Sequence, residues 1–174
     1  MKILIAYASK NGVAKKCAQM LADNLPSTVE GEIVDLTLKT PSLDGYDAVV
    51  VGGSVRAARF DKNIKTFFKN NKSKLSSLPF AVYICCGLSH RYEEYKDILI
   101  PRGLEVSLGV HHFGGELKPD KLKGFDKIVV RALRKSITEG DFEDSDVVER
   151  SLPEIIPENI KLLAEGFKSI KQEH

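Results

Sequence analysis

The sequence predicts an α/β protein, a three-layer sandwich in which helices cover both faces of a five-stranded parallel sheet. Two observations predict this class. Continuous apolar runs, which are typical of strands buried on both faces, alternate along the chain with segments of helical periodicity. The connections between them are short, which fits the strand order 2-1-3-4-5. We expect residues 1–174 to form a single domain.

The first unit, residues 2–25, combines an apolar run, a polar turn and a helix. The run covers residues 3–8, and the turn covers residues 9–12. Apolar residues then recur at helical spacing, at Val13, Cys17, Met20, Leu21 and Leu25. The free amide N–H groups and the dipole at a helix N-terminus favour an anion, phosphate above all. The alternative is that Asn11-Gly12 is only a connection.

The later elements follow the same alternation. Strands are expected at residues 30–36, 46–54, 80–86 and 108–117, with 30–36 at an edge, and helices at 61–73, 92–100, 125–137 and from Pro157 onward. In a 2-1-3-4-5 sheet, ligands bind outside the carboxyl ends of strands 1 and 3. The loops expected there are residues 9–13 and 54–60, with residues 87–92 beside them.

Composition excludes several classes of protein. A net charge of +2 is too mild for a nucleic-acid binder, and no basic stripe with interleaved aromatics occurs. No apolar run approaches the roughly 20 residues of a membrane span, and the N-terminus does not resemble a signal peptide, so we expect a cytoplasmic protein. The cysteines lack metal-ligand spacing, and no metal site or disulfide framework is expected. Cys17 should be in the core, and Cys85 and Cys86 should face opposite sides of a strand.

Residues 5–21 resemble the FMN phosphate-binding signature of flavodoxins. The matching positions are Tyr7, Ser9, Gly12, Ala18 and Leu21, whereas Asn11 and Ala14 stand where flavodoxins usually have threonine. The resemblance implies a flavodoxin-like fold with FMN as the cofactor. It also implies that the phosphate lies on Ser9, Lys10, Asn11, Gly12 and Val13.

A further resemblance covers most of the chain. Residues 51–68, VGGSVRAARFDKNIKTFF, and the region from Gly114 are similar to the menaquinone-dependent protoporphyrinogen oxidases of bacterial haem biosynthesis. That family has a longer insertion after strand 4 than residues 87–105 provide here. The resemblance implies a quinone and a porphyrinogen as partners. It assigns Gly53, Ser54, Val55 and Arg56 to one edge of the flavin ring, and Cys86, Gly87, Leu88 and Tyr92 are further expected cofactor-binding residues. Arg56 and Arg59 are the expected catalytic residues, which would stabilise an anionic reduced flavin; the alternative is that both belong to a solvated loop.

Several residues allow two interpretations. Phe60, His90 and Tyr92 are candidates for stacking on the flavin, although Phe60 suits a cap on the following helix equally well. His111 and His112 should face opposite sides of their strand, so we favour one packed and one exposed histidine over a joint metal or general-base site. The basic segment at residues 118–135 is interpreted as a solvated helix face. The alternatives are contact with anionic lipid at the inner face of the membrane and contact with an acidic substrate.

Other nucleotide-binding motifs are absent from the sequence. No G-x-G-x-x-G follows the first strand, and no P-loop occurs. Ser9 and Ser54 stand where phosphoacceptor receiver domains carry carboxylates. We therefore expect an FMN-dependent oxidoreductase of the protoporphyrinogen oxidase type. The alternatives are a flavodoxin-type electron carrier that docks on a redox partner protein, which the positive net charge opposes, and a flavin-free interaction module.

Overall fold

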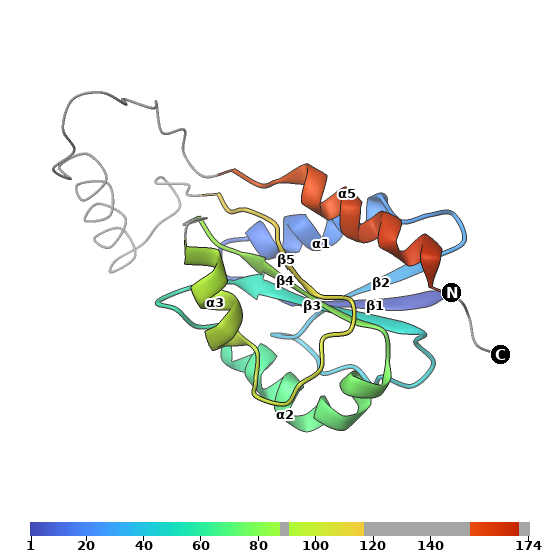
Figure 1. The fold of residues 1–174 in the computed structure, drawn as a ribbon, viewed down its shortest axis with the longest axis horizontal. Coiled ribbons are helices and arrows are strands. Elements are labelled where there is room, and N and C mark those ends of the chain that lie inside the picture. The colour runs from blue at the N-terminus through green and yellow to red at the C-terminus, as the bar shows by residue number, and fades with distance from the viewer. Residues whose placement is uncertain (88–90, 117–153, 171–174) are drawn as a thin grey trace, which may run out of the picture.

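A computed structural model describes residues 1–87, 91–116 and 154–170, and within them a parallel sheet of five strands in the order β2-β1-β3-β4-β5 (Figure 1). The strands are β1 (Lys2–Ala8), β2 (Glu30–Asp35), β3 (Ala48–Ser54), β4 (Phe80–Cys85) and β5 (Val110–His112). The helices are α1 (Val13–Asp23), α2 (Lys62–Ser77), α3 (Tyr92–Leu99) and α5 (Pro157–Gly166), followed by the 3₁₀ turn η3 (Phe167–Ser169). The predicted fold and strand order are confirmed.

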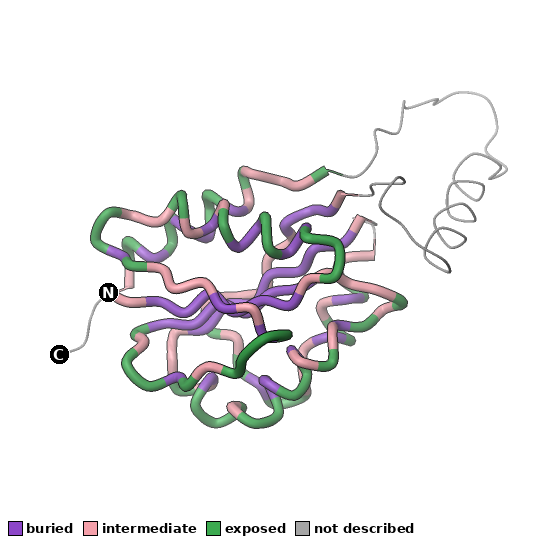
Figure 2. Tube along the Cα trace, turned by 180° about the vertical axis from the view of Figure 1, so that it is seen from behind, coloured by how far each residue is buried: buried purple, intermediate pink, exposed green. Residues whose placement is uncertain are grey.

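Each face of the sheet has its own apolar core. On one face α1, α5 and η3 pack against residues such as Ile5, Val50 and Tyr83, and on the other α2 and α3 pack against residues such as Val51 and Ile84. Figure 2 shows the buried strands between helices whose outer sides are exposed. Burial on both faces explains why the central strands are continuous apolar runs.

The register brings the ends of three strands to one edge of the sheet. Ala8 at the end of β1 pairs with Gly53, and Ser54 at the end of β3 pairs with Cys85. The backbone of Val55 continues this pairing, because its N–H donates to the Cys85 carbonyl at 2.9 Å. Consequently, the loops that follow β1, β3 and β4 meet at the carboxyl edge, on the left-hand side of Figure 1.

The last strand is shorter than predicted. The sequence predicted residues 108–117, whereas β5 contains only Val110–His112. Gly109 and Gly114 flank it with φ angles of +83° and +73°, values that turn the chain out of an extended conformation. Beyond β5, Gly114 forms an antiparallel bridge with Ile155, which joins the region before α5 to the sheet.

Other predicted features lie outside the described residues. They are the helix at residues 125–137, the basic segment at residues 118–135, and the positions of Leu88 and His90. No helix within residues 1–87, 91–116 and 154–170 has the length and apolar content needed to cross a membrane.

Candidate functional site

The loop after β1 presents uncapped amide groups at the start of α1. Gly12 is the N-cap with φ +80°, and no side chain caps the helix there. The first turn of α1 contains no acidic residue, and Lys10, Asn11 and Gly12 are exposed. Because the first amides of a helix lack intrahelical acceptors and carry its positive dipole end, this loop suits an anionic group.

Two buried hydroxyl groups flank this edge of the sheet. Neither Ser9 Oγ, just after β1, nor Ser54 Oγ, at the end of β3, has a hydrogen-bond partner among the described residues. A buried hydroxyl without a partner costs free energy, and native proteins rarely retain one without a reason. Their position beside the uncapped helix fits a ligand that carries a phosphate and several hydrogen-bonding atoms, as FMN does.

The loop after β3 is a tight two-residue hairpin that pairs the two arginines. The backbones of Arg56 and Arg59 exchange hydrogen bonds of 3.0 Å in both directions. Between them Ala57 and Ala58 have φ angles of +47° and +57°, the left-handed region that a type I′ turn requires and that alanine disfavours. The structure thus brings together the two residues that the resemblance designates as catalytic. Arg59 is exposed and Arg56 half-buried.

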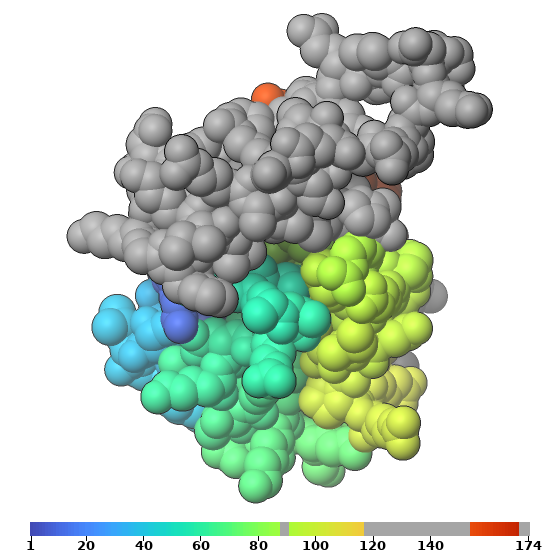
Figure 3. All heavy atoms as spheres, turned by 90° about the vertical axis from the view of Figure 1, so that its left-hand side faces the viewer, coloured from blue at the N-terminus to red at the C-terminus, as the bar shows by residue number. Residues whose placement is uncertain are grey.

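The first two loops are linked across the edge by Lys10. Its ammonium group lies 4.0 Å from the carboxylate of Asp61, which caps α2 by accepting from the Asn63 N–H at 2.9 Å. Figure 3 looks onto this edge and shows the region around residues 54–60, in teal, between blue and light-blue atoms of the first quarter of the chain and the yellow-green α3 segment. Lys10 and the arginine hairpin make this rim predominantly cationic.

The end of β4 is packed against β5 and α3. Cys86 is buried, and its Sγ lies 3.2 Å from Nε2 of His112, whose ring stacks on Tyr92 with the centroids 5.0 Å apart. The Tyr92 hydroxyl donates to the Val110 carbonyl at 2.6 Å, and burial raises the pKa of Tyr92 to about 12. Tyr92 is therefore engaged within the protein, through the Val110 carbonyl and the ring of His112.

The remaining aromatic and histidine candidates pack inside. Phe60 is 4% exposed and meets Phe68 edge-on at 6.4 Å, so it packs against α2 just before the N-cap residue Asp61. His111 and His112 face opposite sides as predicted, but both are half-buried, so the expectation of one exposed histidine is wrong. His111 Nε2 hydrogen-bonds the Leu108 carbonyl at 2.8 Å, and burial lowers the pKa of its imidazole.

The glycines at the end of β3 are explained by packing. A Cβ on Gly52 would lie 2.0 Å from the ring of Tyr83, and a Cβ on Gly53 would lie 2.4 Å from Cδ1 of Ile64. Gly53 was predicted to allow close approach of the flavin, and its contact with Ile64 is an independent reason for glycine there. The role of Tyr83 was missed, because only the β-strand pattern marked it.

The positions predicted for the three cysteines are confirmed. Cys17, Cys85 and Cys86 are buried and free, and Cys85 and Cys86 face different cores. The Cys85 thiol hydrogen-bonds the Cys17 sulfur at 3.6 Å, and this bond together with burial raises the pKa of Cys85. Within the described part of the chain, no three His, Cys, Asp or Glu side chains gather in a way that could hold a metal ion.

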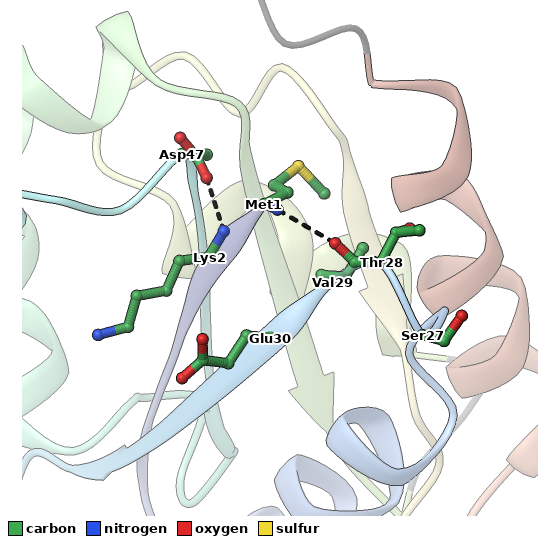
Figure 4. Close-up of a pocket in the computed structure, with 7 residues that line it drawn as sticks. All are labelled: Met1, Lys2, Ser27, Thr28, Val29, Glu30 and Asp47. Atoms are coloured by element: carbon green, nitrogen blue, oxygen red, sulfur yellow. Dashed lines mark hydrogen bonds between the residues drawn. The ribbon is translucent and has the colours of Figure 1, made fainter.

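A hollow of about 670 Å³ lies at the opposite, amino edge of the sheet (Figure 4). It is lined by Met1, Lys2, Ser27, Thr28, Val29, Glu30 and Asp47. Its polar groups are paired with one another: the Met1 amino group donates to the Thr28 carbonyl at 3.1 Å and the Lys2 N–H to Asp47 at 2.6 Å. This hollow is therefore separate from the candidate site.

A doubly wound sheet with an uncapped helix N-terminus at its switch point defines a class of proteins that bind phosphate-bearing cofactors at the carboxyl edge. Within this class, residues 4–145 match the Flavodoxin domain family, and the chain belongs to that family. Membership implies a flavin cofactor.

Individual relatives are more distant. Over 85 residues the chain is 28% identical to protoporphyrinogen IX dehydrogenase (quinone) of Escherichia coli strain K12, an alignment covering 48% of this chain and 47% of that protein. The chain thus spans about half the length of the curated relative it matches.

Solved structures share the fold. A short-chain flavodoxin associated with a bacterial microcompartment superposes with a TM-score of 0.54 at 14% identity, covering 95% of each chain. The rubredoxin oxygen:oxidoreductase of Desulfovibrio gigas superposes with a TM-score of 0.50 at 11% identity, and the match covers 97% of this chain and 37% of that one.

Proposed function

We propose that this chain binds FMN at the carboxyl edge of the sheet and acts as an oxidoreductase that passes electrons from a porphyrinogen to a quinone. The observation that carries the FMN assignment is the pair of buried, unpartnered hydroxyls of Ser9 and Ser54 beside the uncapped start of α1. The family match and the similarity to the quinone-linked dehydrogenase of E. coli support the reaction class.

The residues of the edge have distinct roles in this proposal. The loop Ser9, Lys10, Asn11, Gly12 and Val13 holds the phosphate through backbone N–H groups, with the Ser9 hydroxyl as a further donor. Gly53, Ser54 and Val55 at the end of β3, together with Cys86 and Gly87 after β4, would hold the isoalloxazine ring. When bound, the flavin supplies the redox chemistry, while the protein supplies orientation and electrostatics.

The cationic rim provides the electrostatics. Arg56 and Arg59, held together by the hairpin, favour negative charge on a reduced flavin and attract the propionate groups of a tetrapyrrole. This attraction should weaken as salt is added, because both arginines lie near solvent. With a net charge of +2, the chain lacks the acidic character by which a flavodoxin-type carrier docks on basic partners. That carrier is the second candidate.

FMN binding is tested by titrating the flavin-free protein with FMN and following flavin fluorescence. Gly12→Val should raise the dissociation constant at least tenfold, about 1.4 kcal/mol. A Cβ at Gly12 would meet nothing within 4 Å, but its φ of +80° forces valine to move the backbone and redirect the amides. Gly45→Val is a matched control with φ +81° and equally open surroundings near the amino edge. Equal FMN affinity in the two folded variants would refute the phosphate site.

The reaction is tested in a steady-state assay with protoporphyrinogen and a menaquinone analogue. We expect quinone-dependent turnover that falls at least fivefold in Arg56→Ala, while FMN affinity changes less than threefold because the phosphate loop holds the cofactor separately. Arg102→Ala removes an exposed arginine distant from the three loops and should leave turnover unchanged. An FMN-loaded protein without porphyrinogen turnover, but with rapid electron exchange with a flavoprotein reductase, would identify the carrier instead.

A further inference from the structure

The buried side chain of Tyr83 connects β4 to the first turn of α1. Its hydroxyl donates to the Ala14 carbonyl oxygen at 2.9 Å, a buried hydrogen bond between residues 69 positions apart. Tyr83 is fully buried, and its ring stacks on Phe113 with the centroids 4.7 Å apart and the planes 13° from parallel. The ring is thus fixed by packing, and its one polar atom is directed at α1.

To reach α1, the side chain of Tyr83 crosses β3. Gly52 lies directly beneath the ring, since a Cβ at that position would be 2.0 Å from ring carbons. Gly52 immediately precedes Gly53 and Ser54, and Ala14 follows Gly12 and Val13. One side chain therefore spans from β4 to the segments that carry both loops of the candidate flavin site.

Resting on the proposed function, we propose that Tyr83 is a positioning residue that fixes the phosphate-binding loop through the Ala14 carbonyl. Ala14 occupies the position where flavodoxins usually have threonine, so no side-chain hydroxyl is available there to hold the loop. Its backbone oxygen is instead held by the phenol of Tyr83. The amides that precede Ala14 in the turn are the predicted phosphate donors.

The hydrogen bond from Tyr83 to Ala14 is suited to a permanent structural role. Burial raises the pKa of Tyr83 well above its usual value, so its phenol stays protonated and remains a donor throughout the working pH range. A neutral hydrogen bond of this kind contributes modestly to stability, but losing it frees the start of α1 to shift. Small displacements of donors weaken the binding of a ligand whose geometry they match.

The test compares FMN with riboflavin, which has the same ring but no phosphate. In Tyr83→Phe the ring and its stacking are kept while the hydroxyl is lost. We expect the dissociation constant for FMN to rise about three- to tenfold, in line with one hydrogen bond, and that for riboflavin to change less than twofold. Tyr46→Phe is the matched control, because it also removes a tyrosine hydrogen bond, to Glu32, but away from the loops. Tyr46→Phe should change neither the dissociation constant for FMN nor that for riboflavin.

Hydrogen exchange gives a readout that needs no ligand. Amides in the first two turns of α1 should exchange faster in flavin-free Tyr83→Phe than in the wild type. In Tyr46→Phe their exchange rates should equal those of the wild type. Equal weakening of FMN and riboflavin, or unchanged exchange in α1, would overturn the positioning role while leaving FMN binding intact. A wild-type protein that binds neither flavin would instead refute the proposed function.

Discussion

Gly52→Ala should be among the most destabilising single-methyl additions in this chain. The new Cβ would lie 2.0 Å from Cε1 and Cζ of Tyr83, far inside van der Waals contact. The ring cannot yield easily, because Phe113 stacks on it and its hydroxyl is bonded to the Ala14 carbonyl. Either the ring of Tyr83 is displaced, or β3 and β4 move apart.

The size of the effect follows from what the ring would lose. Overpacking a tight core costs roughly 1–3 kcal/mol. Displacing the ring also forfeits a hydrogen bond of about 1 kcal/mol and an aromatic contact of about 1 kcal/mol. We expect a loss of about 3–5 kcal/mol, which for a chain of this size lowers Tm by roughly 6–20 °C. Because native domains are typically stable by about 5–15 kcal/mol, a chain above the lower end of that range stays folded after such a loss.

Denaturant unfolding followed by circular dichroism measures this loss, with Gly166→Ala as the control. Gly166 ends α5 and has open space where a Cβ would stand, so alanine there should be neutral or stabilise by up to about 1 kcal/mol. In a Tyr83→Ala background the clash is absent, and Gly52→Ala should then cost less than about 1 kcal/mol. A cost below 1 kcal/mol in the wild type, or the same cost in both backgrounds, would refute the crossing of β3 by Tyr83.

Two further predictions concern stability. Burial lowers the pKa of His111, so the unfolded chain binds its proton more readily; the folded state should lose stability as pH falls from 7 through the usual pKa of 6.5 towards the lower folded value. His111→Gln should reduce the pH dependence of the free energy of unfolding between pH 7 and 5. An unchanged slope of that free energy against pH would contradict this. Replacing Ala57 and Ala58 by Asn-Gly, which suits positive φ at both positions, should stabilise by about 1 kcal/mol and raise Tm by about 2–4 °C. A lower Tm would contradict a type I′ turn at these two positions.

The sequence predicted the strand order and most element positions because burial on both faces leaves a strong signal. The runs around Ile5, Val50 and Val82 are apolar at every position, and the helical stripe of α2 at Ile64, Phe67 and Phe68 is buried as expected. The length of the last strand was overestimated, because apolar composition does not report where Gly109 and Gly114 turn the chain.

The candidate site was predicted less completely. Local pattern and resemblance located the loops after β1 and β3, but the contacts that organise them depend on residues far apart in the sequence. Tyr83 and Ala14 are 69 positions apart, and Cys86 and His112 are 26 apart. Such pairs leave no periodic signal. The unpartnered state of Ser9 Oγ and Ser54 Oγ likewise appears only once the surrounding packing is known.

The two outer strands of the sheet bear on how copies of this chain behave when concentrated. An exposed strand edge is a template for pairing with another molecule, and long, flat, apolar edges promote aggregation. Here β5 has only three residues and lies between the turns at Gly109 and Gly114. Strand β2 carries Glu30 and Glu32, with Lys2 and Lys39 within 4.0 Å of the Glu32 carboxylate. Among the described strands, neither edge therefore offers an extended apolar template, and the sheet should resist growing from one molecule into the next.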